Sequence, residues 1–115
     1  ETYPGYLARR ITRASYKKDG KEGATARRRE ARAQIMERLC SANESTKLIG
    51  DLKLDVSATL RQQCIDDGSG DTLDAVLCAV QAAVARRQFE AGDDRYGMPA
   101  GADPLEGWIA TVKAQ

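Results

Sequence analysis

Apolar side chains recur at the spacing of an α-helix in four stretches of the chain. In residues 4–16 the apolar positions are three or four apart, and Pro4 suits the first turn of a helix. Residues 24–40 are strong helix formers with an apolar stripe, and residues 51–65 have apolar positions at a regular spacing of four. The pattern predicts four helices, and the longest of them covers residues 71–91.

The helix predicted at residues 71–91 is apolar around most of its circumference. Leucine and valine occupy one face of this helix. Asp71 and Asp74 lie at the N-terminal end of the other face, and alanine and cysteine occupy the rest of it. A helix that is apolar all round is buried, and small side chains let it lie close against a neighbouring layer such as a sheet. Aspartate is rarely buried unless it is paired or bound to metal, so these two carboxylates are the first candidates for a functional site.

Two segments favour a β-strand, and they lie at the two ends of the chain. The residue before Pro4 is restricted to extended geometry, and residues 108–112 combine aromatic and β-branched side chains. A lone strand can neither satisfy its backbone nor bury a face, so either the ends pair or the sheet lies outside this sequence. We expect an α-rich α+β fold of about four helices with one or two short strands. Residues 1–115 would form a single domain that is the later part of a larger one.

Composition narrows the class of protein. Of the 115 residues, 42% are hydrophobic and 30% are charged, which is typical of one soluble globular domain. The formal net charge of +1 provides no overall attraction to nucleic acid or membranes, so such binding requires a local patch. No apolar run approaches the roughly 20 residues that span a bilayer. Three cysteines without any histidine argue against a zinc site, and together these features favour a cytoplasmic protein with free thiols and no membrane partner.

The helix predicted at residues 24–40 carries a basic surface. Arg28, Arg29 and Arg32 lie close together there and are candidates to bind the phosphate groups of nucleic acid. The alternative is a solvated face whose charge is balanced by glutamates of the same helix. Arg28 differs from the others because its angle around the helix puts it within the apolar stripe, so we expect it to point toward whatever this helix covers.

Asp71 and Asp74 are three residues apart and therefore adjacent on a helix surface. One interpretation is capping, with Asp71 as the N-cap and Asp74 in the first turn, where carboxylates also favour the helix dipole. The other is a Mg²⁺ or Mn²⁺ site, because hard divalent ions prefer carboxylate oxygens and two-metal phosphoryl transfer needs several of them. Asp66 and Asp67, in the glycine-rich turn before the helix, are interpreted as solvated turn residues.

Four short motifs follow one another along the chain. They are Glu1-Thr2-Tyr3-Pro4, the basic segment at Tyr16-Lys17, Asp71-x-x-Asp74-Ala75 followed by an apolar helix, and Glu106-Gly107-Trp108-Ile109. In this order they resemble the later half of a family of domains of unknown function that are predicted to be nucleases of the ribonuclease-H-like superfamily. The resemblance spans nearly the whole chain and rests on both of its ends.

The resemblance implies a five-stranded sheet flanked by helices, with acidic residues that bind two divalent metal ions while water attacks a phosphodiester. Glu1 matches the family's acid at the end of a strand, and Asp71 and Asp74 match its acids at the start of the last helix. These three are the implied catalytic residues and ligands of Mg²⁺ or Mn²⁺. The family's first strand and its aspartate have no counterpart here, so the chain is expected to be inactive alone.

A second hypothesis belongs to a different class of protein. The chain would be a non-catalytic helical interaction module, in which Asp71 and Asp74 only cap a helix and the arginine-rich helix binds an acidic partner or nucleic acid. Under either hypothesis, exposed strand and small-residue surfaces favour self-association into a homo-oligomer.

Overall fold

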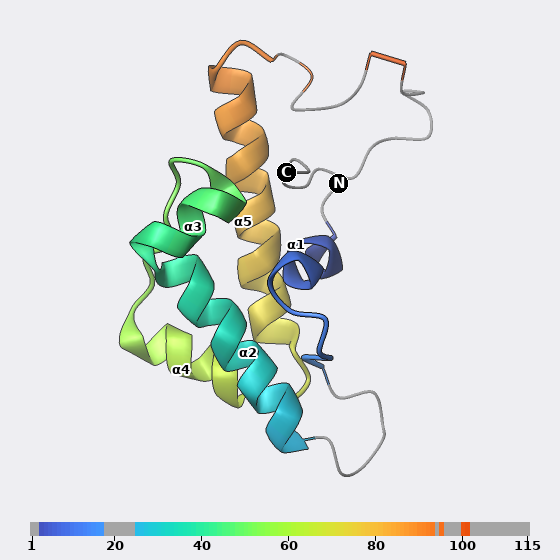
Figure 1. Ribbon diagram of the computed structural model, residues 1–115, viewed down its shortest axis with the longest axis vertical. Helices are drawn as coiled ribbons and strands as arrows, with labels where there is room; N and C mark the ends of the chain where they lie inside the picture. The colour runs from blue at the N-terminus through green and yellow to red at the C-terminus, as the bar shows by residue number, and fades with distance from the viewer. Residues whose placement is uncertain (1–2, 18–24, 94, 96–99, 102–115) are drawn as a thin grey trace.

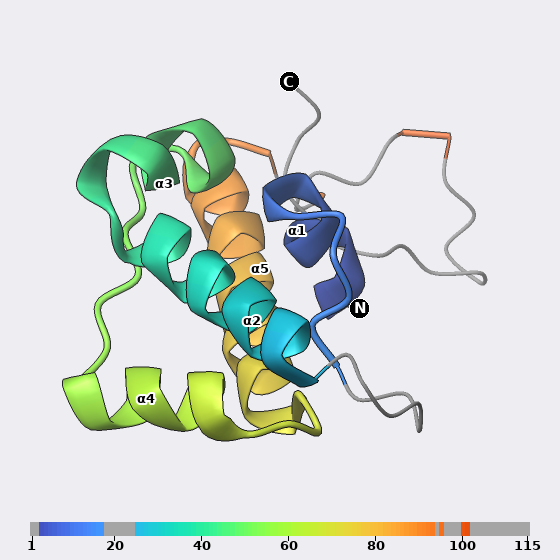
Figure 2. The same cartoon turned by 60° about the horizontal axis from the view of Figure 1, so that its bottom comes forward.

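The computed structural model describes residues 3–17, 25–93, 95 and 100–101 of the chain. This part consists of five helices (Figure 1), which are α1 (Pro4–Ile11), α2 (Thr25–Cys40), α3 (Ala42–Ile49), α4 (Ala58–Asp66) and α5 (Asp71–Glu90). The longest helix, α5, contacts α1 and α4, and α2 contacts α1, α3 and α4. In Figure 2, α4 crosses below α2 near the start of α5. The helices thus form a bundle around α5 and α2.

The apolar core lies where α1, α2 and α5 meet. The largest fully buried apolar side chains come from these three helices, and they are Leu7, Ile35, Met36, Leu39, Leu73 and Leu77. Full burial of a side chain of this size contributes roughly 1.5–3 kcal/mol relative to leaving it exposed. This packing fixes the first half of α5 against α1, which positions the polar groups described below.

The expected α+β fold is wrong for the described residues, which contain helices and no β-strand. Tyr3 does have extended geometry, with φ −135° and ψ 106°. Its N–H donates to Gln81 Oε1 at 2.9 Å, and its C=O accepts from Gln81 Nε2 at 2.7 Å. A side chain of α5 therefore satisfies the backbone groups that a neighbouring strand would pair. Instead of the ribonuclease-H-like sheet that the resemblance implied, the described residues form an all-helical bundle. The second strand candidate, residues 108–112, lies outside them.

The helix predicted at residues 71–91 is present as α5, but its surroundings differ from the prediction. The leucine and valine face is buried except for Val76, which is half-buried, and Gln81 and Ala85 are also buried. On the other side, four alanines are exposed, at Ala75, Ala79, Ala82 and Ala83. The expectation of a helix buried all round, with its small side chains against a sheet, was therefore wrong. The bundle leaves these four alanines uncovered, because α5 meets α1 and α4 with its other side.

Only the second part of the helix predicted at residues 51–65 is present, as α4, which begins at Ala58; the segment before it, residues 52–57, is not helical. In this segment Leu52, Leu54 and Val56 are half-buried and pack on the core, whereas the charged residues between them are exposed. This is the alternation of an extended chain, in which every second side chain faces the same way. A spacing of two also places apolar residues four apart, so the sequence pattern matched a helix equally well.

The helix α3 lies between the helices predicted at residues 24–40 and 51–65 and was not predicted. Ser41 is instead the N-cap of α3 and accepts a hydrogen bond from the N–H of Glu44. A serine followed three residues later by glutamate is the sequence signature of a capping box. In the same way Ser57 caps α4 by accepting from the N–H of Leu60 at 3.1 Å.

The helix α1 ends at Ile11 instead of reaching residue 16. Thr12 adopts extended geometry, with φ −147° and ψ 145°, and its side-chain oxygen accepts from the N–H of Ala14 at 3.1 Å. The last carbonyl of the helix, that of Ile11, accepts from the guanidinium of Arg38 at 3.3 Å. The segment at residues 12–17 therefore departs from the axis of α1 and runs toward the start of α5.

Candidate functional site

The start of α5 requires a glycine. Gly70, the N-cap, has φ 78°, in the left-handed region that favours glycine. A Cβ at this position would lie 2.7 Å from Cγ of Lys17, which is closer than unbonded carbon atoms approach. Gly70 thus turns the chain into the helix and also makes room for Lys17 beside its first turn.

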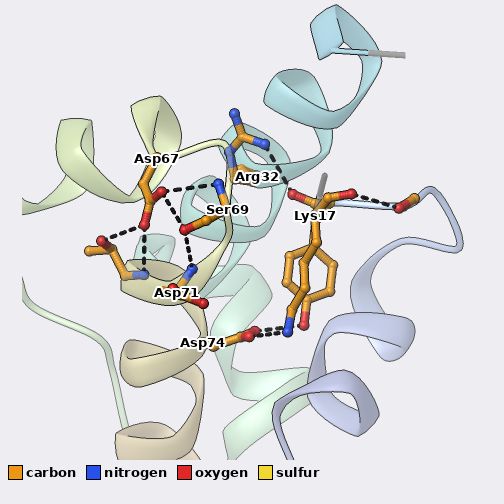
Figure 3. Close-up of polar contacts among 9 residues, drawn as sticks. Lys17, Arg32, Asp67, Ser69, Asp71 and Asp74 are labelled. Carbon is orange, nitrogen blue, oxygen red and sulfur yellow. Dashed lines mark hydrogen bonds and ion pairs between the residues drawn. The ribbon is translucent and has the colours of Figure 1, made fainter. Parts of the chain in front are cut away.

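The cap of α5 is provided by Asp67, in the turn before the helix (Figure 3). Its carboxylate accepts hydrogen bonds from the N–H and hydroxyl of Thr72 at 3.0 and 2.8 Å, and from the N–H and hydroxyl of Ser69 at 3.0 and 2.6 Å. These bonds hold the pKa of Asp67 well below its usual range, the hydroxyl of Ser69 most of all. The capping interpretation therefore named the wrong aspartate, and the interpretation of Asp67 as a solvated turn residue was also wrong.

Asp71, the first residue of α5, is exposed. Its N–H donates to the hydroxyl of Ser69 at 3.2 Å. The side chains of Ser69 and Asp67 already accept hydrogen bonds from the N–H groups of Asp71 and Thr72. Among the described residues, none has its N–H group capped by the carboxylate of Asp71. This carboxylate is therefore open to a ligand from solvent.

The carboxylate of Asp74 lies one turn further along α5 and is engaged on both oxygens. The hydroxyl of Tyr16 donates to Oδ1 at 2.8 Å, and Lys17 forms an ion pair with Oδ2. Figure 3 shows Lys17 and Asp74 pointing toward each other between the segment after α1 and the start of α5. Burial raises the pKa of Tyr16, and the hydrogen bond to Asp74 raises it further. Tyr16 therefore remains a protonated donor at neutral pH.

Arg32 holds the same segment from the other side. Its side chain is 2% exposed, and it donates to the carbonyl of Ile65 at 2.8 Å and to the carbonyl of Tyr16 at 3.0 Å. Burial lowers the pKa of this guanidinium, and the neighbouring Arg29 acts in the same direction. Arg32 thus joins the end of α4 to the residues that carry Tyr16 and Lys17.

The three arginines predicted to bind phosphate lie in different surroundings. Arg28 is 5% exposed, as its position in the apolar stripe predicted, and Arg32 is fully engaged with backbone carbonyls. Arg29 is about half exposed and forms an ion pair with Asp66. Their sequence proximity therefore does not create one open basic surface on α2.

The first described residues are held against the same helix as the two carboxylates. Gln81, which is fully buried, bonds both backbone groups of Tyr3. Asp74 and Gln81 are seven residues apart, about two helical turns, so they lie on one side of α5. Glu1, the third predicted acid, lies outside the described residues, two positions before the residue that Gln81 holds.

The donor atoms of Asp71 and Asp74 are of the type that Mg²⁺ and Mn²⁺ prefer. Within the described part of the chain, no cluster of three or more His, Cys, Asp or Glu side chains is arranged to hold a metal ion. A metal centre at the start of α5 would therefore need at least one further ligand, and Glu1 is the candidate from the sequence. An ion at Asp74 would also compete with Lys17 for Oδ2.

Three residues of this site were missed as functional candidates. Tyr16 and Lys17 were noted only within a basic motif, and Gln81 was not singled out. A glutamine inside an otherwise apolar run is the signal that was available, because a buried amide needs a hydrogen-bonding partner. For Asp67, the signal was the serine two residues later and the threonine five residues later, at the start of a helix.

Comparisons with protein family models, with curated protein sequences and with solved structures found no match to this chain. Among the described helices, none combines the length and apolarity required to cross a bilayer. The function is therefore inferred from the chemistry of the site itself, which combines two carboxylates, a lysine and a protonated tyrosine at the start of one helix.

Proposed function

We propose that this chain is the C-terminal portion of a divalent-metal-dependent nuclease. Asp71 and Asp74, together with Glu1, would hold Mg²⁺ or Mn²⁺. The observation that supports this most is the hydrogen-bonded contact between Gln81 and Tyr3, which secures Tyr3, two positions after Glu1, on the side of α5 that carries Asp74.

The bound metal would supply the chemistry of the reaction, because it polarises a phosphodiester and lowers the pKa of the attacking water. The residues of the chain have supporting roles. Tyr16 orients the carboxylate of Asp74 through its hydroxyl, and Lys17 provides a positive charge beside that carboxylate for a substrate phosphate. Arg28 and Arg32 are buried, and Arg32 holds the segment that carries Tyr16 and Lys17, whereas Arg29 is exposed enough to contact the nucleic acid backbone.

The test is a Mn²⁺ titration by calorimetry on the complete gene product, followed by an assay of DNA and RNA cleavage. Asp74→Asn keeps the size of the side chain and removes its charge, so we expect both Mn²⁺ binding and cleavage to be lost. Asp55→Asn is the matched control, because Asp55 is exposed in the segment before α4 and far from the site along the chain. Unchanged Mn²⁺ binding in Asp74→Asn, or an equal loss in Asp55→Asn, would contradict the proposal.

A second candidate function has one observation in its favour. Both oxygens of Asp74 are already engaged, by Tyr16 and Lys17, in a network that stabilises the fold without any metal. This supports a non-catalytic helical module that binds an acidic partner or nucleic acid. For such a module, Asp74→Asn would lower the melting temperature and leave the activity of the complete protein unchanged. A loss of activity with an unchanged melting temperature would exclude the module.

Two further sequence expectations belong to the same proposal, namely self-association and a cytoplasmic location. Self-association is supported by the exposed alanine face of α5, which would let a second helix approach closely. Light scattering coupled to size-exclusion chromatography measures it directly, and a mass equal to that of one chain at all concentrations would contradict it.

A further inference from the structure

A groove of about 290 Å³ lies between α1 and the segment that follows it. Its lining includes three cationic side chains, Arg9, Arg13 and Lys17, and the ring of Tyr3. The described residues 3–17 contain no aspartate or glutamate. Asp74 of α5 pairs with Lys17, so the net positive charge of the groove comes from Arg9 and Arg13, although the whole chain has a net charge of only +1.

Two of the three cations of this groove, Arg9 and Arg13, are accessible to a new partner, whereas Lys17 is paired with Asp74. Arg9 and Arg13 are exposed, and neither forms an ion pair with a residue in the part of the chain that the structure describes. On α2, by contrast, Arg29 is paired with Asp66 and Arg32 is buried. Among these basic residues, Arg9 on α1 and Arg13 just after it are therefore best able to bind a phosphate.

Tyr3 lines the groove, and the ring of Tyr6 packs against the ring of Tyr3. Tyr3 and Tyr6 are 48% and 42% exposed, and their ring centroids are 5.1 Å apart in an edge-to-face arrangement. Tyr6 and Arg9 are three residues apart and lie on one side of α1, whereas Arg13 lies in the segment after the helix, beyond the extended residue Thr12. Exposed rings beside unpaired cationic side chains are the features that bind single-stranded nucleic acid, by base stacking and phosphate pairing.

We propose that this groove binds single-stranded nucleic acid, with phosphates on Arg9 and Arg13 and a base stacked on Tyr6. Lys17 lines the groove and also contacts Asp74, so a strand in the groove would lead to the start of α5. The inference names the substrate class and its binding surface, and its link to cleavage rests on the proposed function. A duplex fits less well, because its bases are stacked inside and not available to the rings.

The test uses the 115-residue chain in the presence of EDTA, so that it does not depend on the metal site. Fluorescence anisotropy measures binding of a labelled 12-nucleotide oligothymidine, a duplex of the same length and a polyglutamate peptide. Arg9→Gln combined with Arg13→Gln should weaken oligonucleotide binding and reduce the slope of log K against log salt by about 1.4, since each phosphate contact contributes about 0.7. Tyr6→Leu should weaken binding about five-fold or more at an unchanged slope.

The matched control is Lys47→Gln combined with Lys53→Gln, which removes two exposed charges from α3 and the segment after it. Figure 1 shows α3 across α5 from α1. The control should bind oligothymidine like the unaltered chain. Equal weakening in the control and groove variants, equal binding of the duplex, tighter binding of polyglutamate, or no binding would each overturn the proposal. Because no metal is present, these results are independent of whether Asp71 and Asp74 bind Mn²⁺.

Discussion

Gln81 determines how the start of the chain is held against α5, and Gln81→Leu tests this role. The side chain is fully buried and makes one hydrogen bond to the N–H of Tyr3 and one to its C=O. Leucine has a similar volume, so the substitution removes both hydrogen bonds and leaves the apolar packing of α5 nearly unchanged. The two backbone groups of Tyr3 then lose their partners.

The magnitude follows from the number of bonds and the exposure of Tyr3. A hydrogen bond contributes about 1 kcal/mol net, and a buried group left unpaired costs about 1–3 kcal/mol. Tyr3 is 48% exposed, so its backbone regains water when it moves outward, and the larger penalty does not apply. We expect the free energy of unfolding to fall by about 2 kcal/mol, which corresponds to about 8 °C in Tm for a domain of this size.

Urea unfolding followed by far-ultraviolet circular dichroism measures the change. Gln88→Leu is the matched control, because Gln88 lies on the same helix and its side chain makes no hydrogen bond with any residue in the described part. The control should differ from the unaltered chain by less than about 0.5 kcal/mol. Equal stability of the Gln81→Leu and Gln88→Leu variants would refute the role of Gln81.

Three other substitutions test the network at the start of α5. Tyr16→Phe removes a bond to a charged group and should cost about 1.5 kcal/mol at pH 8. Because the pKa of Tyr16 is raised on folding, its contribution is complete below pH about 10 and is lost above it, so in urea unfolding the difference between the two proteins should shrink at pH 11. Asp67 has a lowered pKa, so its contribution is present above pH about 3.9 and is lost below it. Asp67→Asn should therefore lower Tm at pH 7 more than at pH 2.5, and an equal effect at both pH values would contradict this. Arg32→Met leaves two carbonyl oxygens without their donor and should cost about 2 kcal/mol, whereas Arg32→Lys, which can still reach one carbonyl, should cost less.

The long helices were predictable from the sequence because several signals agree there. Residues 24–40 and 71–91 combine strong helix formers, an apolar period and clear breaks at both ends, and they correspond to α2 and α5. Residues 51–65 gave a misleading pattern, because an alternating extended segment and a helix both place apolar residues four apart. A single capping serine, Ser57, is what separates the two interpretations in the structure.

The strand expected at the start of the chain shows a different limit. Local geometry was predicted correctly, since Tyr3 is extended, but the partner of its backbone was not. That partner is Gln81, which is 78 positions away in the sequence. Local propensity fixes the shape of a segment, and only the packing of distant elements decides whether a strand or a side chain satisfies its backbone groups.

The candidate site was predictable only in part for the same reason. The spacing of Asp71 and Asp74 revealed two neighbouring carboxylates, because both lie on one helix. Tyr16 and Lys17, which engage Asp74, come from a segment more than 50 residues earlier, and helical periodicity carries no information about such pairs. Arg32 was predicted to face solvent and ligand, but it is buried because its guanidinium serves two backbone carbonyls.

The most direct test of the proposed nuclease site is paramagnetic broadening by Mn²⁺ in amide spectra of the complete gene product. We predict that substoichiometric Mn²⁺ broadens the resonances at the start of α5, around Asp71 and Asp74, before those of α3 and α4. In Asp74→Asn the broadening at these positions should disappear. Resonances at the start of α5 that stay sharp, or that broaden equally in Asp74→Asn, would contradict a metal site at these carboxylates.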